Sequence, residues 1–323
     1  MSLSNPPRFS LAERQGNRLT FAGDASHVVH VFVLEADLFR VLMEPSTGGL
    51  RFPRTWAIAP GADDVPVDGR DRFDTAGFSS PDYTFSESDE QLVIATPRLR
   101  LTIQRVGFLC RWEMPNAGPS SDGWVEVAAD RPTQGYNFGW WDDKIYHYLA
   151  RTRDEQYFGL GERSGNADRY GQSYRMCNVD PMGYSARTTD PLYKHIPFYL
   201  TRKKQSGLTF GLFYDTLSDC TLDMGKELDN YHGHYRYFKA DYGDLDYYFI
   251  AGGTPAEVTR RFTWLTGRPA FTPRWGLGYS GSTMTYTDAP DAQLRMNEFI
   301  AGCREHDILC DSFHLSSGYT SIG

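Results

Sequence analysis

The segment 98–104 reads Arg-Leu-Arg-Leu-Thr-Ile-Gln, so polar and apolar residues alternate with a period of two. Successive side chains of an extended strand point to opposite faces, which places Leu99, Leu101 and Ile103 together on one face. The other face carries only polar side chains. This pattern is typical of an antiparallel strand that covers a core with its apolar side. The segment therefore predicts β-structure around a core, not an isolated helix.

Strand-like segments recur over the first two thirds of the chain. They are β-branched or aromatic runs bounded by Gly, Pro or polar residues, and they cover 28–34, 38–43, 91–95, 195–201, 208–214 and 246–250. The polar stretch 202–207 ends in glycine and is expected to join two of these segments as a hairpin. Many short strands with few helical periods predict a mainly β chain built as a large β-sandwich.

The pattern changes after Gly252-Gly253. The next residues, Thr-Pro-Ala-Glu at 254–257, have the composition of a capping box with proline in the first turn. Val258, Phe262 and Leu265 then recur at helical spacing and predict a short helix over 255–266. Gly267 and Pro269 end it. We therefore expect a β-sandwich domain over 1–268, with this helix leading out of it, and a new unit from 269.

Residues 269–323 resemble one β-α-β unit. The segment 275–279 is expected to be a short buried strand, 289–306 a helix and 308–315 a second strand. A parallel pair of strands needs neighbours and is normally buried on both faces. We therefore expect an incomplete parallel unit, whose exposed apolar surface further chain or a second copy of the protein would cover.

Composition excludes several classes of function. The formal net charge is −8 and no basic stripe is present, so nucleic acid is not an expected partner. No apolar run reaches the roughly 18 residues of a membrane helix, and the first residues lack the pattern of a secretory signal. The five cysteines are widely spaced and form no Cys-x-x-Cys pair. We expect free thiols in a cytoplasmic protein, with no metal site.

Several segments, in order along the chain, resemble the N-terminal half of glycoside hydrolase family 31. They are 157–162 (Tyr-Phe-Gly-Leu-Gly-Glu), 178–180 (Asn-Val-Asp), 190–199 (Asp-Pro-Leu-Tyr-Lys-His-Ile-Pro-Phe-Tyr), 207–213, 265–269, 273–279 and 310–315. The resemblance implies a galactose-mutarotase-like β-sandwich that leads into a (β/α)8 barrel. It also implies cleavage of terminal α-linked glucosyl or related residues with retention of configuration, without a cofactor.

Retention requires two carboxyl groups about 5–5.5 Å apart, one as nucleophile and one as acid/base. The resemblance implies that both lie on later strands of the barrel. A complete barrel needs roughly 250 residues, whereas 269–323 supply only the first β/α units. We therefore expect a truncated barrel, no catalytic residue in these 323 residues and no activity of this chain alone.

The resemblance implies three substrate-binding positions. Asp180, in Asn-Val-Asp, would accept hydrogen bonds from hydroxyls of the nonreducing sugar; the alternative is that it only starts a turn before Pro181. Met284 aligns with an aromatic position of the sugar pocket. Ser316 stands about where α-glucosidases carry an aspartate, which favours an α-xyloside or a decorated glucoside, unless the loop aligns differently.

Two alternatives to the α-glycosidase remain open. In the first, the β-sandwich is a noncatalytic carbohydrate-binding or scaffold protein, and the reading frame after Gly323 discriminates the two. In the second, the protein is a mutarotase, which needs a His/Glu pair facing the sugar. His195 and Glu162 are the candidates for that pair.

Overall fold

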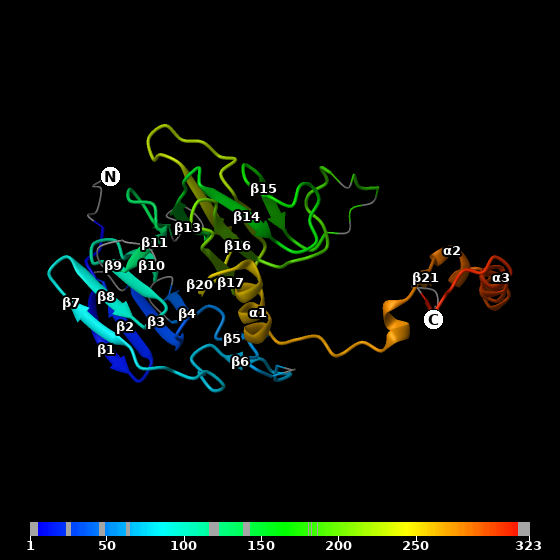
Figure 1. Cartoon of the computed structure of the whole chain (residues 1–323), viewed down its shortest axis with the longest axis horizontal. Coiled ribbons are helices and arrows are strands. Elements are labelled where there is room, and N and C mark those ends of the chain that lie inside the picture. Colours follow the sequence, from blue (N-terminus) through cyan, green and yellow to red (C-terminus); the bar gives the residue numbers. More distant parts are fainter. Residues whose placement is uncertain are drawn as a thin grey trace. The chain divides into compact units, whose positions relative to one another are not determined.

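The computed structural model describes residues 6–23, 27–44, 49–62, 65–115, 123–137, 143–179, 181, 183–185 and 187–315. The chain divides into two compact units, Met1–Arg268 and Pro269–Gly323. The described residues of the first unit form β-sheets and one α-helix, whereas those of the second form short helices and a small parallel sheet (Figure 1). The mainly β architecture predicted from the sequence is confirmed.

Within the described residues, the largest sheet of the first unit has eight strands. Their order is β1 (Ser10–Gln15), β2 (Arg18–Ala22), β3 (Val28–Glu35), β4 (Leu38–Glu44), β20 (Leu245–Gly252), β17 (Thr209–Tyr214), β16 (Phe198–Lys203) and β14 (Glu155–Gly159). All neighbours pair antiparallel. The central pair β4–β20 joins segments about 200 residues apart, so the two ends of the first unit meet in the middle of this sheet.

Two five-stranded antiparallel sheets accompany the large sheet in the described residues. The first has the order β11 (Trp124–Ala129), β10 (Leu109–Pro115), β9 (Arg100–Gln104), β8 (Gln91–Ala95) and β7 (Thr84–Glu87). The second has the order β12 (Tyr136–Asn137), β13 (Ile145–Ala150), β19 (Tyr235–Ala240), β18 (Cys220–Asp223) and β15 (Ser173–Met176). A short pair, β5 (Arg54–Thr55) and β6 (Arg70–Asp71), lies outside these sheets.

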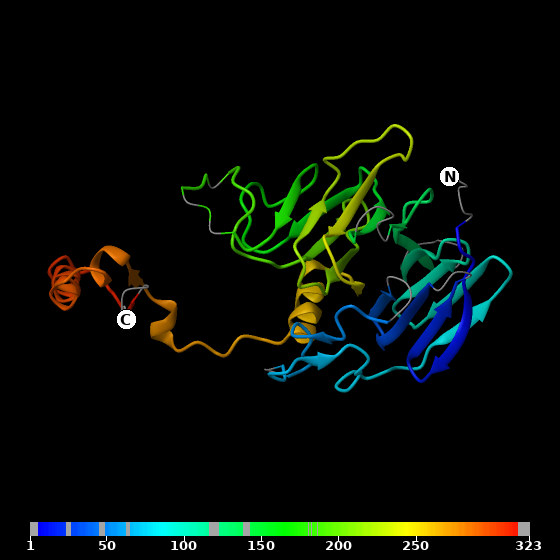
Figure 2. The ribbon, with the colours of Figure 1, turned by 180° about the vertical axis from the view of Figure 1, so that it is seen from behind.

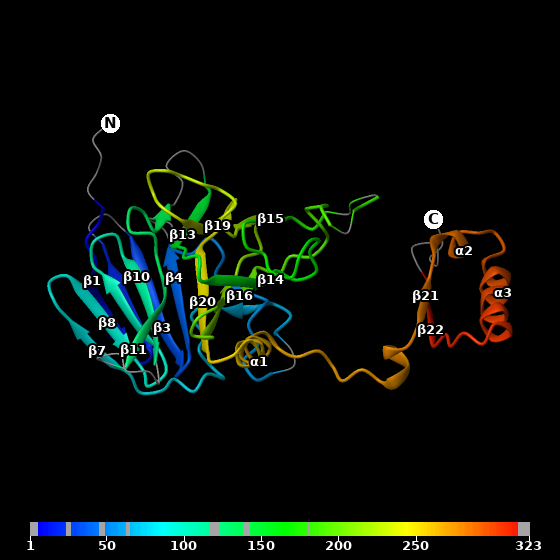
Figure 3. The same ribbon diagram turned by 45° about the horizontal axis from the view of Figure 1, so that its top comes forward.

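The core of the sandwich lies between the large sheet and the two smaller sheets. One cluster of buried side chains contains residues of all three, for example Val31 of β3, Ile103 of β9 and Phe238 of β19. Figure 3 shows β7–β11 lying against β1–β4 in this way. Trp112 of β10 stacks on Phe249 of β20, with ring centroids 4.2 Å apart, and so joins two layers of the sandwich.

Helix α1 (Pro255–Thr266) covers the opposite face of the large sheet (Figure 2). Val258 and Leu265 are fully buried against strands of that sheet, and Phe262 stacks on Phe198 of β16 at 3.7 Å. Thr254 is the N-cap, as the sequence predicts: its hydroxyl oxygen accepts a hydrogen bond from the Glu257 amide at 3.3 Å. The part of the large sheet beneath α1 is therefore buried on both faces, which explains why every residue of β17 and β20 is buried.

Arg100–Gln104 of the alternating segment form β9, which confirms the predicted strand. Leu101 and Ile103 are fully buried, and β9 pairs antiparallel with β8. Thr102, on the polar face, is buried as well, because its hydroxyl donates to Glu113 at 3.2 Å. Arg100 donates two hydrogen bonds of 2.7 Å to the same carboxylate. An ion pair therefore covers the polar face of this strand at Thr102, whereas Gln104 remains exposed.

The second unit differs from the sequence prediction at both strands. Residues 275–279 are not a strand: Arg274–Leu277 form a 3-10 turn, and strand β21 covers Ser280–Ser282. The second strand, β22, is limited to Ser312–His314 and pairs with β21 in parallel. Trp275 and Leu277 are 59% and 79% exposed, so the described residues provide no packing surface that would hold this segment extended. Between the strands lie α2 (Met284–Thr287) and α3 (Ala292–Glu305).

Candidate functional site

The segment 177–197 connects β15 to β16 and projects from the sandwich; it is the green connection that extends beyond the sheets in Figure 1. It contains the Asn-Val-Asp motif. Asn178 has a left-handed backbone (φ 47°), which asparagine tolerates better than most residues. Asp180 lies outside the described residues. The described residues on either side of it nevertheless define how the segment leaves the sandwich and returns to it.

The base of this segment is closed by polar contacts. Arg163 Nη1 donates to Asp190 Oδ1 at 3.3 Å, and its Nη2 donates to the carbonyl of Lys194. The second oxygen of Asp190, Oδ2, accepts a hydrogen bond from the backbone amide of Arg175 in β15, at 2.7 Å. Ser164 Oγ donates to the Thr189 carbonyl at 2.6 Å. The outgoing and returning ends of 177–189 are therefore held together at Asp190.

The side chain of Arg163 is fully buried, whereas that of Asp190 is 21% exposed. Burial lowers the pKa of Arg163, and the nearby charge of Asp190 acts in the opposite direction. An arginine remains charged at any pH at which proteins fold, because its reference pKa lies above 12. The pair is consequently a buried cation with one countercharge, and carbonyls of the returning chain supply its other acceptors.

The Phe-Gly-Leu-Gly turn that precedes Arg163 depends on its two glycines. Gly159 has φ 115°, and a Cβ atom there would lie 2.8 Å from the carbonyl oxygen of Phe198. Gly161 has φ 68°, and a Cβ there would lie 2.8 Å from Ile196 Cδ1. Both positions favour glycine for conformational and steric reasons. The turn therefore brings the chain directly against the end of the projecting segment.

Strand β14 leads into this turn and is anchored by a buried ion cluster. Glu155 accepts hydrogen bonds from Lys203 Nζ at 2.6 Å and Arg236 Nη1 at 3.0 Å, and from the hydroxyl of Tyr157. Burial alone would raise the pKa of Glu155, but the charges of Arg236 and Lys203 outweigh it and hold this pKa below its usual range. The cluster fixes the strand from which the candidate site is built.

His195 and Glu162, the candidates for a mutarotase pair, are engaged by different partners. His195 Nε2 lies 3.0 Å from the carbonyl oxygen of Thr216, and burial lowers the pKa of this histidine. Glu162 forms an exposed ion pair with Lys194 at 3.4 Å. This arrangement does not favour the mutarotase alternative, because neither side chain is held toward a common ligand.

In the second unit, Met284 is the first residue of α2 and is 57% exposed. The hydroxyl of Thr283 caps this short helix by accepting from the Thr285 amide at 3.2 Å. Ser316 lies outside the described residues. Hence, of the three substrate-binding residues predicted from the sequence, the structure describes only Met284, and their mutual arrangement stays a prediction.

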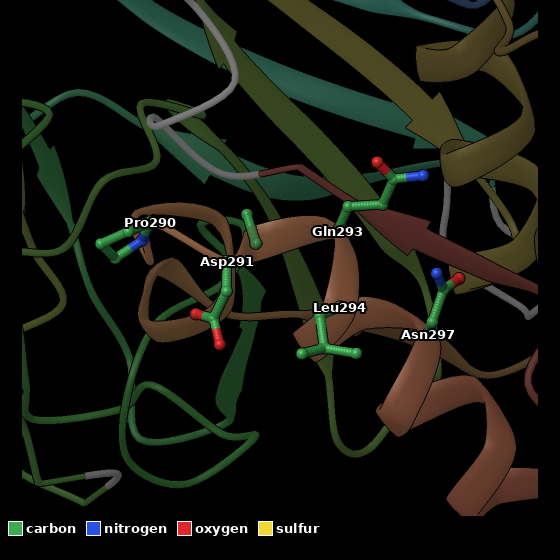
Figure 4. A pocket seen from close by; sticks show the side chains of 6 residues that line it. Pro290, Asp291, Gln293, Leu294 and Asn297 are labelled. Carbon is green, nitrogen blue, oxygen red and sulfur yellow. The ribbon is translucent and has the colours of Figure 1, made fainter.

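A shallow hollow lies at the start of α3 (Figure 4). Its lining side chains are Pro290, Asp291, Ala292, Gln293, Leu294 and Asn297. These side chains diverge in Figure 4, and the labelled ones are exposed, so the hollow presents no convergent set of polar groups. It therefore gives no reason to place a ligand there.

The described residues contain no group of three His, Cys, Asp or Glu side chains that could hold a metal ion. All five cysteines are free thiols. The helices in the described ranges are too short or too polar to span a membrane.

Sequence reasoning missed Arg163 and Asp190 as parts of the site. Asp190 belongs to a segment that carried the family resemblance and Arg163 directly follows one, yet nothing in the local pattern marks a loop arginine as buried. The only available signal was their position, since each stands next to a stretch that was already singled out: Arg163 follows 157–162, and Asp190 begins 190–199. The contact between them became visible only when the fold brought residues 27 positions apart together.

Comparison with known proteins gives a consistent result. Residues 28–223 match the family described as glycosyl hydrolase 31 N-terminal galactose mutarotase-like domain. The chain is 26% identical over 238 residues to α-glucosidase 2 of Bacillus thermoamyloliquefaciens, covering 74% of this chain and 28% of that protein. It is 34% identical over 167 residues to the α-xylosidase XylQ of Lactiplantibacillus pentosus, covering 51% and 20%.

Among solved structures, the dextranase FjDex31A of Flavobacterium johnsoniae in complex with isomaltotriose matches with a TM-score of 0.76 and 25% identity. The match covers 99% of this chain and 34% of the dextranase. The chain thus spans between a fifth and about a third of the length of these three proteins.

Proposed function

The chain belongs to glycoside hydrolase family 31, and from this premise we propose that it is the N-terminal part of a retaining α-glycosidase. The proposed substrates are oligosaccharides or glycosides with terminal α-linked glucosyl or related residues. Relatives named α-glucosidase and α-xylosidase, and a dextranase bound to isomaltotriose, support this substrate class. The five free thiols support a reducing, cytoplasmic location.

One observation carries the proposed role of Asp180 in sugar binding. The segment 177–197 contains two acidic residues, Asp180 and Asp190. Both oxygens of Asp190 are already occupied by protein donors, Arg163 and the Arg175 amide. Asp190 is therefore committed to structure, which leaves Asp180 as the carboxylate of this segment that would accept sugar hydroxyls. Met284 and Ser316 of the second unit are also proposed to be substrate-binding residues.

The second unit is proposed to begin a catalytic (β/α)8 barrel. The parallel pair β21–β22, with α2 and α3 between its strands, is the repeating unit of such a barrel. We propose that the nucleophile and the acid/base lie outside these 323 residues, and that this chain alone does not turn over substrate. The share of the relatives' length that the chain spans supports this proposal.

The decisive experiment compares the 323-residue chain with the product of the complete gene on aryl α-glucosides, aryl α-xylosides and isomaltotriose. We expect turnover by the complete product and none by the 323-residue chain. Turnover by the short chain would contradict the proposed absence of the catalytic carboxylates. A complete product that binds these sugars without cleaving them would instead establish the noncatalytic carbohydrate-binding alternative.

The role of Asp180 is tested in the active product by Asp180→Asn. Loss of two charge-assisted hydrogen bonds, at about 1.5–3 kcal/mol each, should lower kcat/KM by roughly 10²–10⁴-fold. The matched control is Asp229→Asn, in the connection between β18 and β19, where the carboxylate accepts a hydrogen bond from the nearby Tyr231 amide at 2.6 Å. Equal activities of the two variants would show that Asp180 only starts a turn.

A further inference from the structure

The buried guanidinium of Arg163 joins the sandwich to the returning end of the projecting segment, through a fork of hydrogen bonds. Arg163, immediately after the Gly-Leu-Gly-Glu turn, directs Nη1 at Asp190 Oδ1 (3.3 Å) and at the Leu192 carbonyl (3.5 Å), and Nη2 at the Lys194 carbonyl. These acceptors all lie on the returning limb of the projecting segment. A planar guanidinium can satisfy several acceptors at fixed angles, which a flexible ammonium cannot do.

The outgoing limb is tied to the same group. Asp190 Oδ2 accepts a hydrogen bond of 2.7 Å from the backbone amide of Arg175, the penultimate residue of β15. Further along the segment, Ser185 and Thr189 form a small turn of their own, with the Ser185 amide donating to Thr189 Oγ1 at 2.7 Å. One carboxylate therefore joins the point where the segment leaves β15 to the point where it returns.

Arg163 is in turn held by its neighbours. Arg169 Nη2 donates to the Arg163 carbonyl at 3.3 Å, and Arg169 Nη1 donates to the Ser164 carbonyl at 2.8 Å. Arg169 therefore holds the turn 163–164 in place. Both Arg163 and Arg169 are less than one tenth exposed, so water and salt screen these contacts weakly.

We propose that Arg163 and Asp190 are positioning residues for sugar binding: they hold together the points at which the segment that carries Asp180 leaves β15 and returns toward β16. The inference rests on the proposed function of Asp180. Presenting a binding group in its bound geometry lowers the entropy that binding must overcome. Neither Arg163 nor Asp190 needs to touch the sugar for this effect.

The first test measures amide hydrogen exchange in the 323-residue chain, without substrate. Arg163→Lys keeps the positive charge but loses the fork, and we expect exchange in peptides covering 177–189 to become at least about tenfold faster while β16 and β17 stay unchanged. The matched control is Arg175→Lys. The side chain of Arg175 pairs with Asp241, and only its backbone amide holds Asp190. Unchanged exchange of 177–189 in Arg163→Lys, or an equal increase in the control, would overturn the inference.

The second test is a double-mutant cycle in the active product of the complete gene. Arg163→Lys should raise KM for isomaltotriose roughly 10- to 100-fold with a smaller change in kcat, since it disturbs a group that holds the sugar before and during reaction. In an Asp180→Asn background the same change should have almost no further effect. Full additivity of the two substitutions would overturn the inference, because Arg163 would then act elsewhere.

The two tests also separate the inference from the proposed function. If the complete product cleaves no α-glycoside, the proposed function fails, and the exchange experiment alone decides whether Arg163 holds the segment. If the product is active and sensitive to Asp180→Asn but the substitutions are additive, the proposed function stands and the positioning role fails.

Discussion

The substitution Glu155→Gln removes the negative charge from a side chain that is 1% exposed. Its carboxylate accepts from Lys203 Nζ at 2.6 Å, from Arg236 Nη1 at 3.0 Å, and from the Tyr157 hydroxyl. Glutamine keeps one acceptor oxygen but presents an NH2 group to the cations on its other side. The guanidinium of Arg236, which is 0% exposed, would then remain buried without its countercharge.

Removing one partner of a buried ion pair costs about 3–5 kcal/mol, because the remaining charge stays desolvated. The loss of two hydrogen bonds to charged groups, at about 1.5–3 kcal/mol each, gives a similar cost in stability. Lys203 contributes less than Arg236, since its side chain is 13% exposed and can reach water. We therefore expect the free energy of unfolding of the sandwich to fall by about 3–5 kcal/mol.

Urea denaturation followed by near-ultraviolet circular dichroism measures this change, because buried aromatic rings such as Trp112 report on the packed sandwich. The matched control is Glu162→Gln. Glu162 pairs with Lys194 at 3.4 Å, but the two side chains are 78% and 53% exposed, and such pairs contribute about 0–1 kcal/mol. Equal losses in the two variants would refute the reasoning from burial.

The pH dependence gives a second readout of Glu155. Its pKa is lower in the folded chain than in the unfolded one, for the reasons given above. The stabilisation is therefore fully present above the unfolded pKa, about 4.3 for glutamate, and is lost as the pH falls through the lower folded value. Glu155→Gln should lack this part of the acid destabilisation. Parallel stability profiles of the two proteins below about pH 4 would contradict the assignment.

Two further substitutions test how α1 is attached. Gly211→Ala should lower the stability of the sandwich by about 1–3 kcal/mol, because the added methyl would lie 2.7 Å from Val258 Cγ1 and 2.9 Å from Phe198 Cε2; an unchanged Tm would mean that the helix can shift away freely. Thr254→Ala should cost about 1 kcal/mol in thermal unfolding, since the Glu257 amide loses its acceptor. Thr254→Ser keeps that acceptor, so an equal loss in both variants would exclude capping as the cause.

Local sequence patterns predict those strands and helices of the first unit that have a clear polar/apolar periodicity. The alternating segment 98–104 contains β9, and the helix that Thr254 caps runs over Pro255–Thr266. The strand expected at 275–279 fails because its apolar residues need partners to stay extended. In the described residues Trp275 and Leu277 remain largely exposed, and the chain pairs at Ser280–Ser282 instead. Apolar composition predicts burial only where a surface exists to bury against.

The arrangement of the strands and their charges could not be predicted in the same way. Nothing local in 38–44 or 245–252 indicates that β4 pairs with β20. Nothing in the sequence marks Glu155 as buried, because glutamate is almost never fully buried unless it is paired. Glu155 is instead buried, because Arg236 and Lys203 converge on it from two other strands. A charged residue such as Glu155 can be buried when the fold brings countercharges to it from distant parts of the sequence.

The projecting segment is the extreme case of this dependence. Val179 and Tyr184 are 41% and 60% exposed, so these two apolar side chains do not anchor the segment. Polar contacts at its base do so instead, through Arg163 and Asp190. Apolar periodicity in the sequence does not reveal such contacts, because they are hydrogen bonds between residues that are far apart in sequence. For this reason the family resemblance predicts a sugar-binding residue in this segment, whereas only the structure identifies the contacts at the base of the segment.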